Sequence, residues 1–513
     1  MATMLDHDLS TAFPAGTLIT DPGECAFYAQ DVHSDGAAPC AVFRPANIDE
    51  LSAGLAAAHA RRLAIVPRGG GMSYTKGYLT EDAGALIVDL SRMDRILEVD
   101  PVDMAVTVEA GCTWAALRDR LKPLGVRVPR WGTLSGIKAT VGGGMSQNGV
   151  FWGGGNGTIA ETALSFDVVL ADGTILRTGS GFLRPFGPDL TGLFAADTGA
   201  FGIKAHITLP LEREAEAFGY GSFAFDTPDQ AFGAMSEIAR QGLAAECFGF
   251  DPFLQAQRMK RDSLGSDAKA LVGMMKAQGS FWKAVKEGAK VVAAGRSFLD
   301  QARFSAHLIV EGRTEAAAAE DLKRVERIVT EAGGRSVENT IPKVLRANPF
   351  PPVNSMLGPD GERWVPVHGI VRHSRAVEAV ARIGTLYEAH AAEMERLGVG
   401  AGYMFLTVGR TGFLIEPVFF FPDSWGELHR RSVEPAHLAR LKEAPANAEA
   451  RALVDRLRKR IIDIFGELEA VHLQIARTYP LKERSDPAGW QVLEAVKRAV
   501  DPEGTMNPGA LGL

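Results

Sequence analysis

The chain contains Pro67-Arg68-Gly69-Gly70-Gly71-Met72-Ser73 and, further along, Thr140-Val141-Gly142-Gly143-Gly144-Met145-Ser146-Gln147-Asn148-Gly149. Both stretches include Gly-Gly-Gly-Met-Ser, and the first follows the strand-like run Leu63–Val66. Runs of glycine can turn successive backbone N–H groups to one side, which makes a concavity that holds phosphate oxygens. The serine hydroxyls and the Arg68 guanidinium would add further donors. We therefore expect two loops that hold a diphosphate from both sides.

Other nucleotide-binding and catalytic motifs do not fit these stretches. The Walker pattern Gly-x-x-x-x-Gly-Lys-Ser/Thr does not occur. A Rossmann fingerprint needs a helix that opens directly on the glycines and an acidic residue about 20 positions later, whereas the residues after Gly71 are turn-like. Gly-x-Ser-x-Gly and His-Glu-x-x-His are also absent. For each loop taken alone, the alternative that its glycines serve only tight turns stays open.

The composition is that of an ordinary globular protein with more than one domain. The chain has 513 residues, of which 46% are hydrophobic and 23% charged, and a typical domain has about 150 residues. Its 55 basic and 62 acidic residues give a net charge of −7, which offers no reason to expect a nucleic-acid partner. Glycine is the unusual residue, because ten of the 56 glycines lie between Gly132 and Gly157.

Cysteine usage and the amino terminus indicate a compartment. Cys25, Cys40, Cys112 and Cys247 form no Cys-x-x-Cys pair, so we expect no zinc ribbon, no disulfide framework and a reducing environment. Residues Met1–Ala12 lack Lys and Arg and do not resemble a leader. No run approaches the ~20 apolar residues of a membrane span. The expected location is the cytoplasm, with peripheral contact to the inner face of the membrane as a further expectation.

The sequence predicts an α+β fold with two differently organised parts. The first part alternates short strands and helices, and it includes an Asp-Gly hairpin signal within Ala171–Thr174. From about Phe218 three units follow, each of which reads strand, helix, strand; this pattern predicts one antiparallel sheet covered by helices. The elements expected in the first part are Leu51–Arg62 (helix), Leu63–Val66, Ala85–Leu90, Ile96–Val99, Ala105–Glu109 (strands) and Thr113–Lys122 (helix). Those expected later are Phe218–Phe225, Pro228–Gln241, Cys247–Phe250; Ser305–Glu311, Glu315–Ala332, Arg335–Asn339; Val365–Val371, Arg375–Leu397, Tyr403–Val408; and a helix at Ala448–Leu468.

One segment of the second part differs from its surroundings. Phe281–Phe298 is predicted to be a helix with three aromatic residues and several lysines. Such a helix could lie on a membrane surface or on an electron-accepting partner. The alternative, a helix packed on its own domain with solvated lysines, is the stronger interpretation.

Five separated motifs together resemble the FAD-binding domain of the vanillyl-alcohol oxidase/p-cresol methylhydroxylase (PCMH) superfamily. They are Pro67–Ser73, Thr133–Gly149, Phe166–Gly173, Gly199–Ile203 and the tail Asp501–Gly509. The resemblance covers roughly residues 40–210 and 470–513. It implies a two-lobed PCMH-type FAD-binding domain over residues 1–215, a substrate or cap domain over 216–470, and a C-terminal segment, 471–513, that returns to the FAD domain.

The resemblance also implies which residues hold the cofactor. Backbone groups of the two glycine loops would bind the phosphates and the ribityl chain, the Gly199–Ile203 turn would approach the adenine or the flavin, and the tail would lie near the flavin. The implied FAD-binding residues are Pro67, Arg68, Gly69, Gly70, Gly71, Met72, Ser73, Thr133, Leu134, Ser135, Thr140, Gly142, Gly143, Ser146, Asn148, Gly149, Gly199, Gly202, Ile203 and Asn507.

Many members of this superfamily attach FAD covalently, often through a histidine. This chain has Met72 in the first glycine loop, and the cap segment Gly409–Val418 has glycine where vanillyl-alcohol-type oxidases place histidine. No cysteine falls within Thr133–Gly149. The resemblance therefore implies FAD that is not covalently bound.

Several polar residues are candidates for the substrate side of the flavin. Hydride removal from an alcohol or a hydroxy acid needs a base, and an anionic substrate also needs a cationic donor. His368 is the candidate base, with a satisfied structural histidine as the equal alternative. Arg477 and Tyr479 would bind a phenolate or a carboxylate, unless Arg477 pairs with an acidic neighbour. Glu416 is a charge within apolar sequence and must find a partner if it is buried. Further candidates for the same pocket are Arg410, Tyr403 and His472.

We expect no catalytic metal. His368 and His373 are five positions apart, so on one continuous strand they would point to opposite faces. The resemblance adds that metal-using relatives carry a His-x-Gly-Asp-Gly-Asn-type strand, which this chain lacks.

The resemblance favours an FAD-dependent dehydrogenase of a D-2-hydroxy acid, similar to D-lactate or glycolate dehydrogenases. The alternative is an oxidase of a para-substituted phenol or an aromatic alcohol, and a non-enzymatic flavin-binding protein is a third interpretation. The expected partners are an anionic small-molecule substrate, an electron acceptor that is oxygen, a quinone or a cytochrome, and further copies of the chain in a homo-oligomer.

Overall fold

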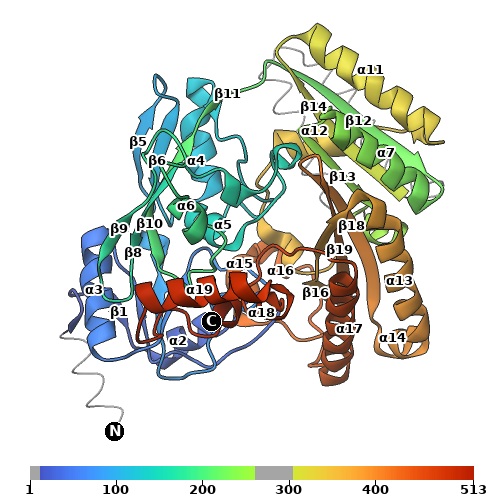
Figure 1. The fold of residues 1–513 in the computed structure, drawn as a ribbon. Helices are drawn as coiled ribbons and strands as arrows, with labels where there is room; N and C mark the ends of the chain where they lie inside the picture. Colours follow the sequence, from blue (N-terminus) through green and yellow to red (C-terminus); the bar gives the residue numbers. More distant parts are fainter. Residues whose placement is uncertain (1–11, 260–303) are drawn as a thin grey trace.

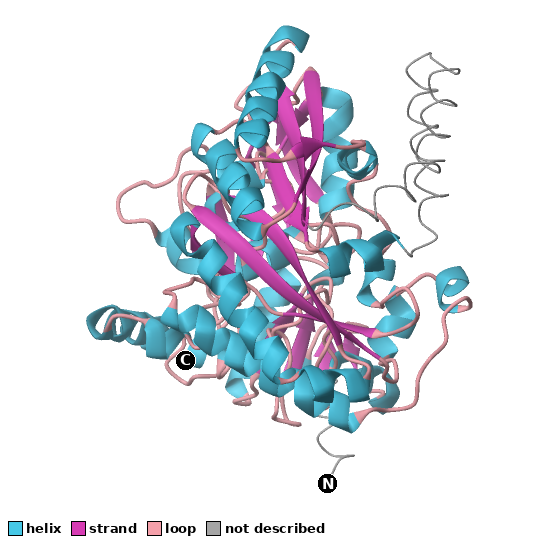
Figure 2. Cartoon of the chain, turned by 90° about the vertical axis from the view of Figure 1, so that its right-hand side faces the viewer, coloured by secondary structure: helices cyan, strands magenta, loops and turns pink. Residues whose placement is uncertain are grey.

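A computed structural model describes residues 12–259 and 304–513. Helices and strands alternate along the described chain, which confirms the α+β prediction (Figure 1). The N-terminal half carries two sheets, of four and five strands, and a separate pair in which Glu212–Arg213 lies antiparallel to Val126–Arg127; a larger sheet with its helices stands beside them (Figure 1). In the view turned by 90°, helices cover most of the outside and strands run through the middle (Figure 2). The predicted surface helix Phe281–Phe298 lies outside the described residues.

The first lobe is built on a small sheet whose order is β1-β2-β4-β3. Helix α3 crosses between two parallel strands, and the Asn47 side chain caps it by accepting a hydrogen bond from the Glu50 N–H. The strand predicted at Leu63–Val66 lies two residues further along the chain, because β3 begins at Ile65 and continues through Pro67 to Arg68. Proline is tolerated there because β3 is the last strand of this sheet. The bounds are β1 Leu18–Ile19, α2 Pro22–Tyr28, β2 Ala41–Phe43, α3 Ile48–Ala60, β3 Ile65–Arg68 and β4 Leu86–Asp89.

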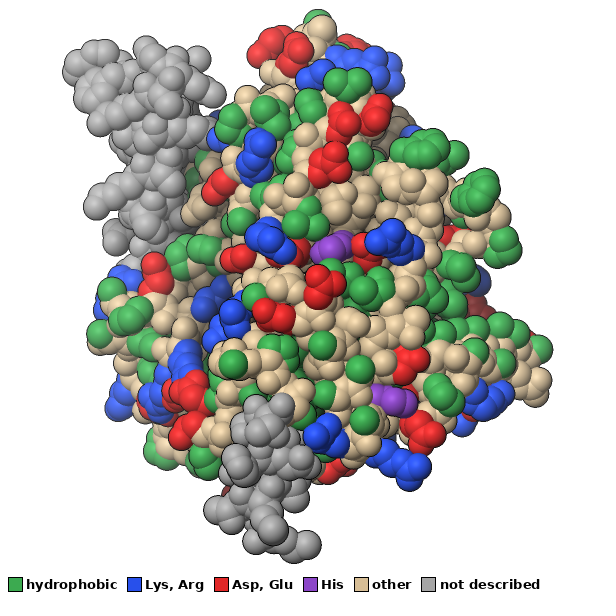
Figure 3. Space-filling view, turned by 90° about the vertical axis from the view of Figure 1, so that its left-hand side faces the viewer, with side chains coloured by type: hydrophobic (Ala, Val, Ile, Leu, Met, Phe, Trp, Pro, Cys, Tyr) green, Lys and Arg blue, Asp and Glu red, His purple; other side chains and the backbone are tan. Residues whose placement is uncertain are grey.

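The second lobe is a five-stranded antiparallel sheet in the order β5-β6-β10-β8-β9. The Asp-Gly signal does make the β8–β9 hairpin. On the side of the molecule that faces the viewer in Figure 3, basic and acidic side chains are interspersed, with no broad field of one sign. The bounds are β5 Ile96–Asp100, β6 Ala105–Glu109, α4 Trp114–Leu121, β7 Val126–Arg127, α5 Val141–Gln147, β8 Ser165–Val169, β9 Ile175–Arg177, α6 Leu190–Phe194, β10 Ile203–Pro210 and β11 Glu212–Arg213.

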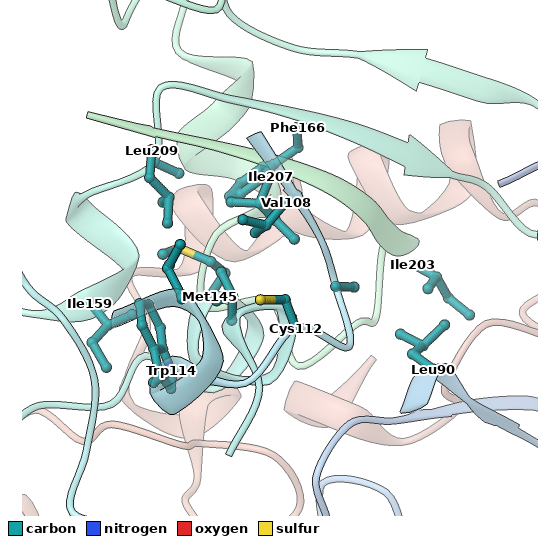
Figure 4. Packing of buried hydrophobic residues seen from close by; sticks show 14 of the residues in the cluster. Leu90, Val108, Cys112, Trp114, Met145, Ile159, Phe166, Ile203, Ile207 and Leu209 are labelled. Atoms are coloured by element: carbon teal, nitrogen blue, oxygen red, sulfur yellow. The ribbon is translucent and has the colours of Figure 1, made fainter. Parts of the chain in front are cut away.

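The second glycine stretch is a helix, α5, and not the loop predicted from the sequence. Three glycines in the first turn disfavour a helix, but two features outweigh this cost. The Thr140 hydroxyl caps α5 by accepting from the Gly143 N–H at 3.1 Å. The Met145 side chain is fully buried with Trp114, Val108 and other core residues of the lobe (Figure 4). Tertiary packing therefore overrides the low helix propensity of glycine.

The third sheet is antiparallel and has eight strands, in the order β15-β12-β14-β13-β18-β19-β16, with β17 also paired to β19. The predicted strand Val365–Val371 is in fact two strands, and the predicted helix Arg375–Leu397 is interrupted at His390. The bounds are β12 Ala217–Phe225, α7 Pro228–Gln241, β13 Glu246–Phe250, α8 Pro252–Met259, β14 Phe304–Gly312, α11 Glu315–Glu331, β15 Arg335–Ser336, α12 Thr340–Ala347, β16 Arg363–Pro366, β17 Gly369–Arg372, α13 Ala376–Ala389, α14 Ala391–Leu397, β18 Gly400–Val408 and β19 Gly412–Phe421.

Both faces of this large sheet are covered, which explains why β19 is almost entirely apolar. Phe413 and Ile415 belong to the core under α7, α13 and α17, whereas Leu414 and Phe420 pack toward the N-terminal half. Side chains alternate between the two faces of a strand, so neighbouring residues serve different cores. Glu416 falls on the second face and is directed toward the N-terminal half.

The end of the chain returns to the first lobe. The backbone after Asp501 runs beside β3, where Asn507 N donates to Ile65 O and Ile65 N donates to Thr505 O. Helix α19 crosses the N-terminal half in Figure 1. The remaining bounds are α15 Glu427–Ser432, α16 Pro435–Leu438, α17 Ala448–Glu467, α18 Leu481–Arg484 and α19 Pro487–Val500. No described element crosses residue 215, since β11 ends at Arg213 and β12 begins at Ala217; the predicted domain limits themselves stay predictions.

Candidate active site

A cavity of about 270 Å³ lies between the N-terminal half and the large sheet. One end is formed by the first glycine loop, by α5 and by the Thr198–Lys204 turn, and the other end by β18, β19 and the Leu473-Gln474 segment. The cavity therefore connects the predicted phosphate site with the inner face of the large sheet. Of the twenty predicted FAD-binding residues, eighteen line it and Asn148 and Asn507 do not.

Arg68 supplies positive charge at the glycine end. Its residue is only 6% exposed, and its guanidinium carbon lies 4.7 Å from the ring centre of Tyr28 and 5.3 Å from that of Tyr78. Its Nε has no hydrogen-bond partner within the described part of the chain. A buried guanidinium with an unused donor is a natural partner for an anionic oxygen.

The glycines of the first loop are required by close backbone contacts. A Cβ on Gly70 would lie 1.9 Å from the Lys138 carbonyl oxygen, and Gly71 has a φ of +71°. A side chain at either position would fill the space between the two glycine stretches or strain the backbone. Three buried side-chain oxygens of lining residues have no hydrogen-bond partner among the described residues: Thr198 Oγ1 and Gln147 Oε1 beside the glycines, and Gln257 Oε1 on α8. The glycine end thus fits a group rich in hydrogen-bonding oxygens and nitrogens, as the FAD diphosphate and ring system are.

Asn148 and Asn507 shape the wall from behind. Asn148 ends α5 in the left-handed conformation, with a φ of 55°, and its Oδ1 accepts from the Ala160 N–H at 3.0 Å. Asn507 is fully buried, and its Nδ2 donates to the carbonyls of Gly77 and Thr198 at 3.1 and 2.7 Å. Because Thr198 lines the cavity, Asn507 positions the wall rather than contacting its contents.

His368 lines the cavity, but its ring nitrogens are engaged elsewhere. The Nε2 atom lies 3.0 Å from the Leu473 carbonyl oxygen, and Nδ1 lies 3.1 Å from the Tyr479 hydroxyl. The same hydroxyl accepts from the His368 backbone N–H at 3.0 Å, so its proton is available to Nδ1. Burial lowers the pKa of His368 to about 4. These contacts describe a neutral structural histidine, the alternative left open from the sequence, and they oppose its role as the base.

Tyr479 and His472 extend this cluster away from the cavity. Their rings stack with centres 4.0 Å apart, and His472 Nδ1 lies 2.7 Å from the His368 carbonyl oxygen. Burial lowers the pKa of His472 to about 3. The lining of the cavity includes neither residue. Both therefore hold His368 in place instead of contacting a substrate.

Arg477 lies outside the cavity lining and holds the C-terminal tail. Its Nη1 donates to the Lys76 carbonyl at 2.9 Å, and its Nη2 donates to Asn507 Oδ1 and to the Pro508 carbonyl at 2.7 Å each. Burial lowers the pKa of Arg477 to about 10. Backbone carbonyls and an amide thus occupy Nη1 and Nη2, and no ion pair joins Arg477 to a carboxylate among the described residues; its predicted contact with a substrate anion stays a prediction.

Two further candidates, Arg410 and Tyr403, are not part of the cavity lining. Arg410 is exposed at the turn between β18 and β19, where its carbonyl lies 3.0 Å from His373 Nε2. Tyr403 is on the helix-covered face of β18 and stacks on Phe405 with ring centres 5.9 Å apart. His368 lies in the gap between β16 and β17 and His373 begins the short helix after β17, so the two histidines are not on one continuous strand.

Glu416 lines the cavity on β19. Tyr74 and Gln474, which were not identified from the sequence, line the cavity with it. The Tyr74 hydroxyl accepts from Gln474 Nε2 at 3.3 Å, which leaves the Tyr74 proton available to a ligand. Burial raises the pKa of Tyr74 well above its ordinary value, and the negative charge of Glu416 adds to that rise. The Trp364 ring meets Tyr74 edge-on at 5.7 Å. Only one signal could have identified Tyr74, namely its position directly after the first glycine loop.

The two ends of the cavity differ in charge. Among the described lining residues, the cations are Arg68 and Lys204, both of which lie at the glycine end, and the Lys204 ammonium already contacts Asp197 at 2.5 Å. The large-sheet end presents mainly apolar side chains around Glu416: Leu254, Met356, Trp364, Met404, Leu406, Leu414, Phe420 and Leu473. That end can hold an apolar body with one hydroxyl near Tyr74 and Glu416.

The described ranges show no metal cluster, no membrane-spanning helix and no disulfide. Residues 12–259 and 304–513 include no group of three or more His, Cys, Asp or Glu side chains that could hold a metal ion. None of the described helices has the length and apolar character needed to span a bilayer. The four cysteines form no disulfide with one another, and none lines the cavity.

Two protein families match the chain. The family of the FAD binding domain matches residues 39–179, and the C-terminal domain of FAD linked oxidases matches residues 433–511. These matches identify FAD as the cofactor for which the glycine end is built. Non-covalent attachment of the FAD stays a prediction.

Curated relatives are similar over part or most of the chain. A probable mitochondrial D-lactate dehydrogenase of Danio rerio is 32% identical over 213 residues, which is 40% of this chain and 41% of that protein. The glycolate oxidase subunit GlcD of Bacillus subtilis is 30% identical over 39% of this chain and 43% of its own length. The matched region therefore spans less than half of these relatives. GlcD of Escherichia coli K12 is 24% identical over 92% of this chain and 83% of that subunit.

Solved structures confirm the fold predicted from the resemblance. A 4-ethylphenol oxidase from Gulosibacter chungangensis superimposes with a TM-score of 0.73 at 16% identity, covering 100% of this chain and 98% of that one. A p-cresol methylhydroxylase with bound substrate gives 0.71 at 17% identity, covering 100% and 96%. An alkyldihydroxyacetonephosphate synthase gives 0.71 at 16% identity, covering 98% and 85%. At these identities the similarity establishes the two-part architecture alone.

Proposed function

We propose that this chain, which carries an FAD binding domain and the C-terminal domain of FAD linked oxidases, is an FAD-dependent oxidoreductase that removes a hydride from a hydroxyl-bearing carbon. The observation that carries the proposal is that one continuous cavity joins the glycine end to a mainly apolar chamber, in which Glu416 is the carboxylate among the described lining residues. When bound, FAD would supply the hydride acceptor. The protein then has to position the substrate and manage one proton.

The residues of the chamber suit these two tasks. Tyr74 would donate a hydrogen bond to the substrate oxygen, because Gln474 already donates to the Tyr74 oxygen and leaves the Tyr74 proton unused. Glu416 would accept the hydroxyl proton, because among the described residues it is the carboxylate that lines this end of the cavity. The apolar side chains around both residues would exclude water from the reacting atoms. At the other end, Arg68 and the glycine backbones would hold the diphosphate.

We propose a D-2-hydroxy acid as the substrate, with oxidation to the 2-oxo acid. This proposal is supported by the similarity to D-lactate dehydrogenases and glycolate oxidase subunits. A second candidate, oxidation of an aromatic alcohol or a para-substituted phenol, is favoured by one observation. Within the described residues, the chamber end has aromatic and aliphatic walls and contains no Lys or Arg.

Anaerobic mixing tests the proposal and separates the two substrate classes. D-lactate and D-2-hydroxyglutarate should bleach the yellow flavin absorbance if the substrate is a hydroxy acid, and vanillyl alcohol should bleach it if the second candidate holds. L-lactate is the matched control for stereochemistry. Full retention of the absorbance with all four compounds would contradict both substrate assignments.

The non-covalent attachment is tested separately. Acid precipitation should release the flavin into the supernatant. Among the described residues, the first glycine loop presents Met72 to the cavity at the position where many members of the superfamily have the attaching histidine, and no cysteine lines the cavity. Flavin that stays in the pellet would contradict this expectation.

The partners and the location are part of the same proposal. We propose oxygen, a quinone or a cytochrome as the electron acceptor, a homo-oligomeric state, and no nucleic-acid partner. The last point is supported by the net charge of −7 and by the interspersed charges of the face in Figure 3. Cytoplasmic location stays a prediction. Assays of reduced enzyme with oxygen, a water-soluble quinone and cytochrome c would identify the acceptor class.

A further inference from the structure

The segment of residues 179–190, which joins β9 to α6 and includes Leu190 as the first residue of α6, exposes an unusual amount of apolar surface. Phe186 is 85% exposed, Phe182 72%, Leu183 60% and Leu190 48%. Within residues 12–259 and 304–513, no other phenylalanine is exposed. Isolated apolar residues on a surface are ordinary, but several large ones on one short loop mark an interaction site. We call residues 179–190 the apolar loop.

Hydrogen bonds hold the apolar loop in one shape. The Ser180 hydroxyl donates to the Leu183 carbonyl at 2.7 Å and accepts from the Leu183 N–H at 3.0 Å. The Arg184 guanidinium donates to the Asp189 carboxylate at 2.9 Å, and its Nη1 donates to the Ala160 and Ala163 carbonyls at 3.3 Å each. Asp189 also accepts from the Gly192 N–H at 2.8 Å and so caps α6. The exposed rings are therefore presented on a framework that is already ordered.

The same contacts remove charge from the outer surface of the loop. Arg184 is the only basic residue in the loop, and its side chain is 18% exposed because it turns inward onto the Ala160 and Ala163 carbonyls. Asp189, the only acidic residue, is its partner. The segment that carries Phe182 and Phe186 thus offers phenyl and aliphatic groups with no outward ionic group among them.

We propose that the apolar loop inserts into the interfacial region of a lipid bilayer and attaches the protein peripherally to a membrane surface. A bilayer accepts a short protruding loop with phenyl and leucyl side chains at the level of the headgroups and the upper acyl chains. A second copy of the chain is a poorer occupant. The two phenyl groups expose roughly 300 Å² in all, whereas a stable protein interface buries about 800 Å² on each partner.

The proposal makes a specific statement about the driving force. The loop provides no outward cation and the whole chain carries a net charge of −7, so attraction to anionic lipids cannot supply the binding. Binding should therefore occur on zwitterionic vesicles and should change little with salt. This behaviour is opposite to that of a basic surface helix, whose binding needs anionic lipid and weakens as salt screens the charges.

Vesicle flotation with the flavin-loaded protein tests the proposal. The wild type should float with phosphatidylcholine vesicles, and added phosphatidylglycerol or salt should change the bound fraction less than twofold. F182S/F186S should lower the partition coefficient at least about tenfold, because two phenyl groups no longer enter the apolar region. V102S is the matched control, since Val102 is 87% exposed on an unrelated turn, and it should bind as the wild type does.

Two measurements keep the result interpretable. Flavin content and the thermal unfolding midpoint should be the same in F182S/F186S and in the wild type, because the replaced side chains are exposed. The proposal is overturned if the wild type does not float, or if F182S/F186S floats as well as the wild type. It is also overturned if the double variant turns a dimer into a monomer without lipid, which would identify a second copy as the occupant.

Discussion

Individual side chains divide the cavity into a cofactor end and a substrate end. Arg68 provides buried positive charge where the diphosphate is expected, and Glu416 provides a carboxylate where the substrate is expected. The structural histidine His368 lies between these ends and is neutralised by burial and by its two neighbours. The sequence analysis assigned the base to His368, whereas we propose Glu416 for that role, and each assignment can be tested by a single replacement.

Replacing Glu416 should slow the reaction without releasing the cofactor. In Glu416→Gln the amide cannot accept the hydroxyl proton, so the rate of flavin reduction should fall at least about a hundredfold, within the range found for general bases. Anaerobic stopped-flow measurement of the flavin absorbance gives this rate. Glu395→Gln, an exposed site on α14, is the control. A reduction rate within twofold of the wild type would remove Glu416 from the reaction.

Replacing Arg68 should have the opposite effect, on the cofactor alone. Arg68→Met removes charged donors from a buried site, and one hydrogen bond to a charged group contributes about 1.5–3 kcal/mol. The dissociation constant of FAD from the apoprotein should therefore rise at least about tenfold, as measured by fluorescence titration. Arg92→Met, an exposed site, should leave the constant unchanged. Equal affinity in the two variants would contradict the assignment of Arg68 to the diphosphate.

At the scale of elements, the sequence predicts the cofactor side well because backbone geometry restricts residue choice there. Gly70 has no room for a Cβ, and so the motif itself identifies the position. The conformation of the second stretch was predicted wrongly, since α5 depends on packing of Met145 in the lobe core. Glu416 was identifiable as a charge in an apolar strand. Gln474 and Trp364 were not, because only the folded chain brings distant segments together around the cavity.

The stability of the folded protein should depend on pH through His368, which lies at the junction of β16 and β17. The pKa of His368 is about 4 in the folded chain and about 6.5 in an unfolded one, since burial disfavours the charged form. Between these values only the unfolded chain binds the proton. The contribution of neutral His368 to the free energy of unfolding is therefore complete above pH 6.5. It is lost as the pH falls toward 4, by up to about 3 kcal/mol.

Comparison with His368→Gln isolates this contribution. The variant should have a lower unfolding midpoint than the wild type at pH 7.5, because contacts with Tyr479 and Leu473 are weakened. The difference between the two proteins should shrink as the pH is lowered to 5, since the variant has no group to protonate at this position. Differential scanning fluorimetry at several pH values gives the midpoints. A difference that is constant with pH would show that His368 is not the titrating group.

At the scale of the whole molecule, ion pairs join the N-terminal half to the large sheet at the side remote from β19. Arg127 on β7 donates to Glu212 at 2.8 Å and also to Glu311 on β14, and Arg346 on α12 contacts Glu311 at 2.9 Å. The Arg127 and Glu311 side chains are 9% and 14% exposed. Burial makes such a network costly to break on one side only, because the remaining partner stays buried with its charge uncompensated.

Arg127→Met should therefore loosen the two halves by leaving Glu311 with one partner fewer. Removing one member of a buried pair costs about 3–5 kcal/mol, so the unfolding midpoint should fall by several degrees. Arg324→Met, which breaks an exposed pair on α11, should change it by less than about one degree. Adding Glu311→Gln to Arg127→Met should cost less than the two single replacements added together, since both residues belong to one network in which Arg346 also pairs with Glu311. If Glu311→Gln lowered the stability of Arg127→Met by as much as it lowers that of the wild type, the two halves would not be coupled through this pair.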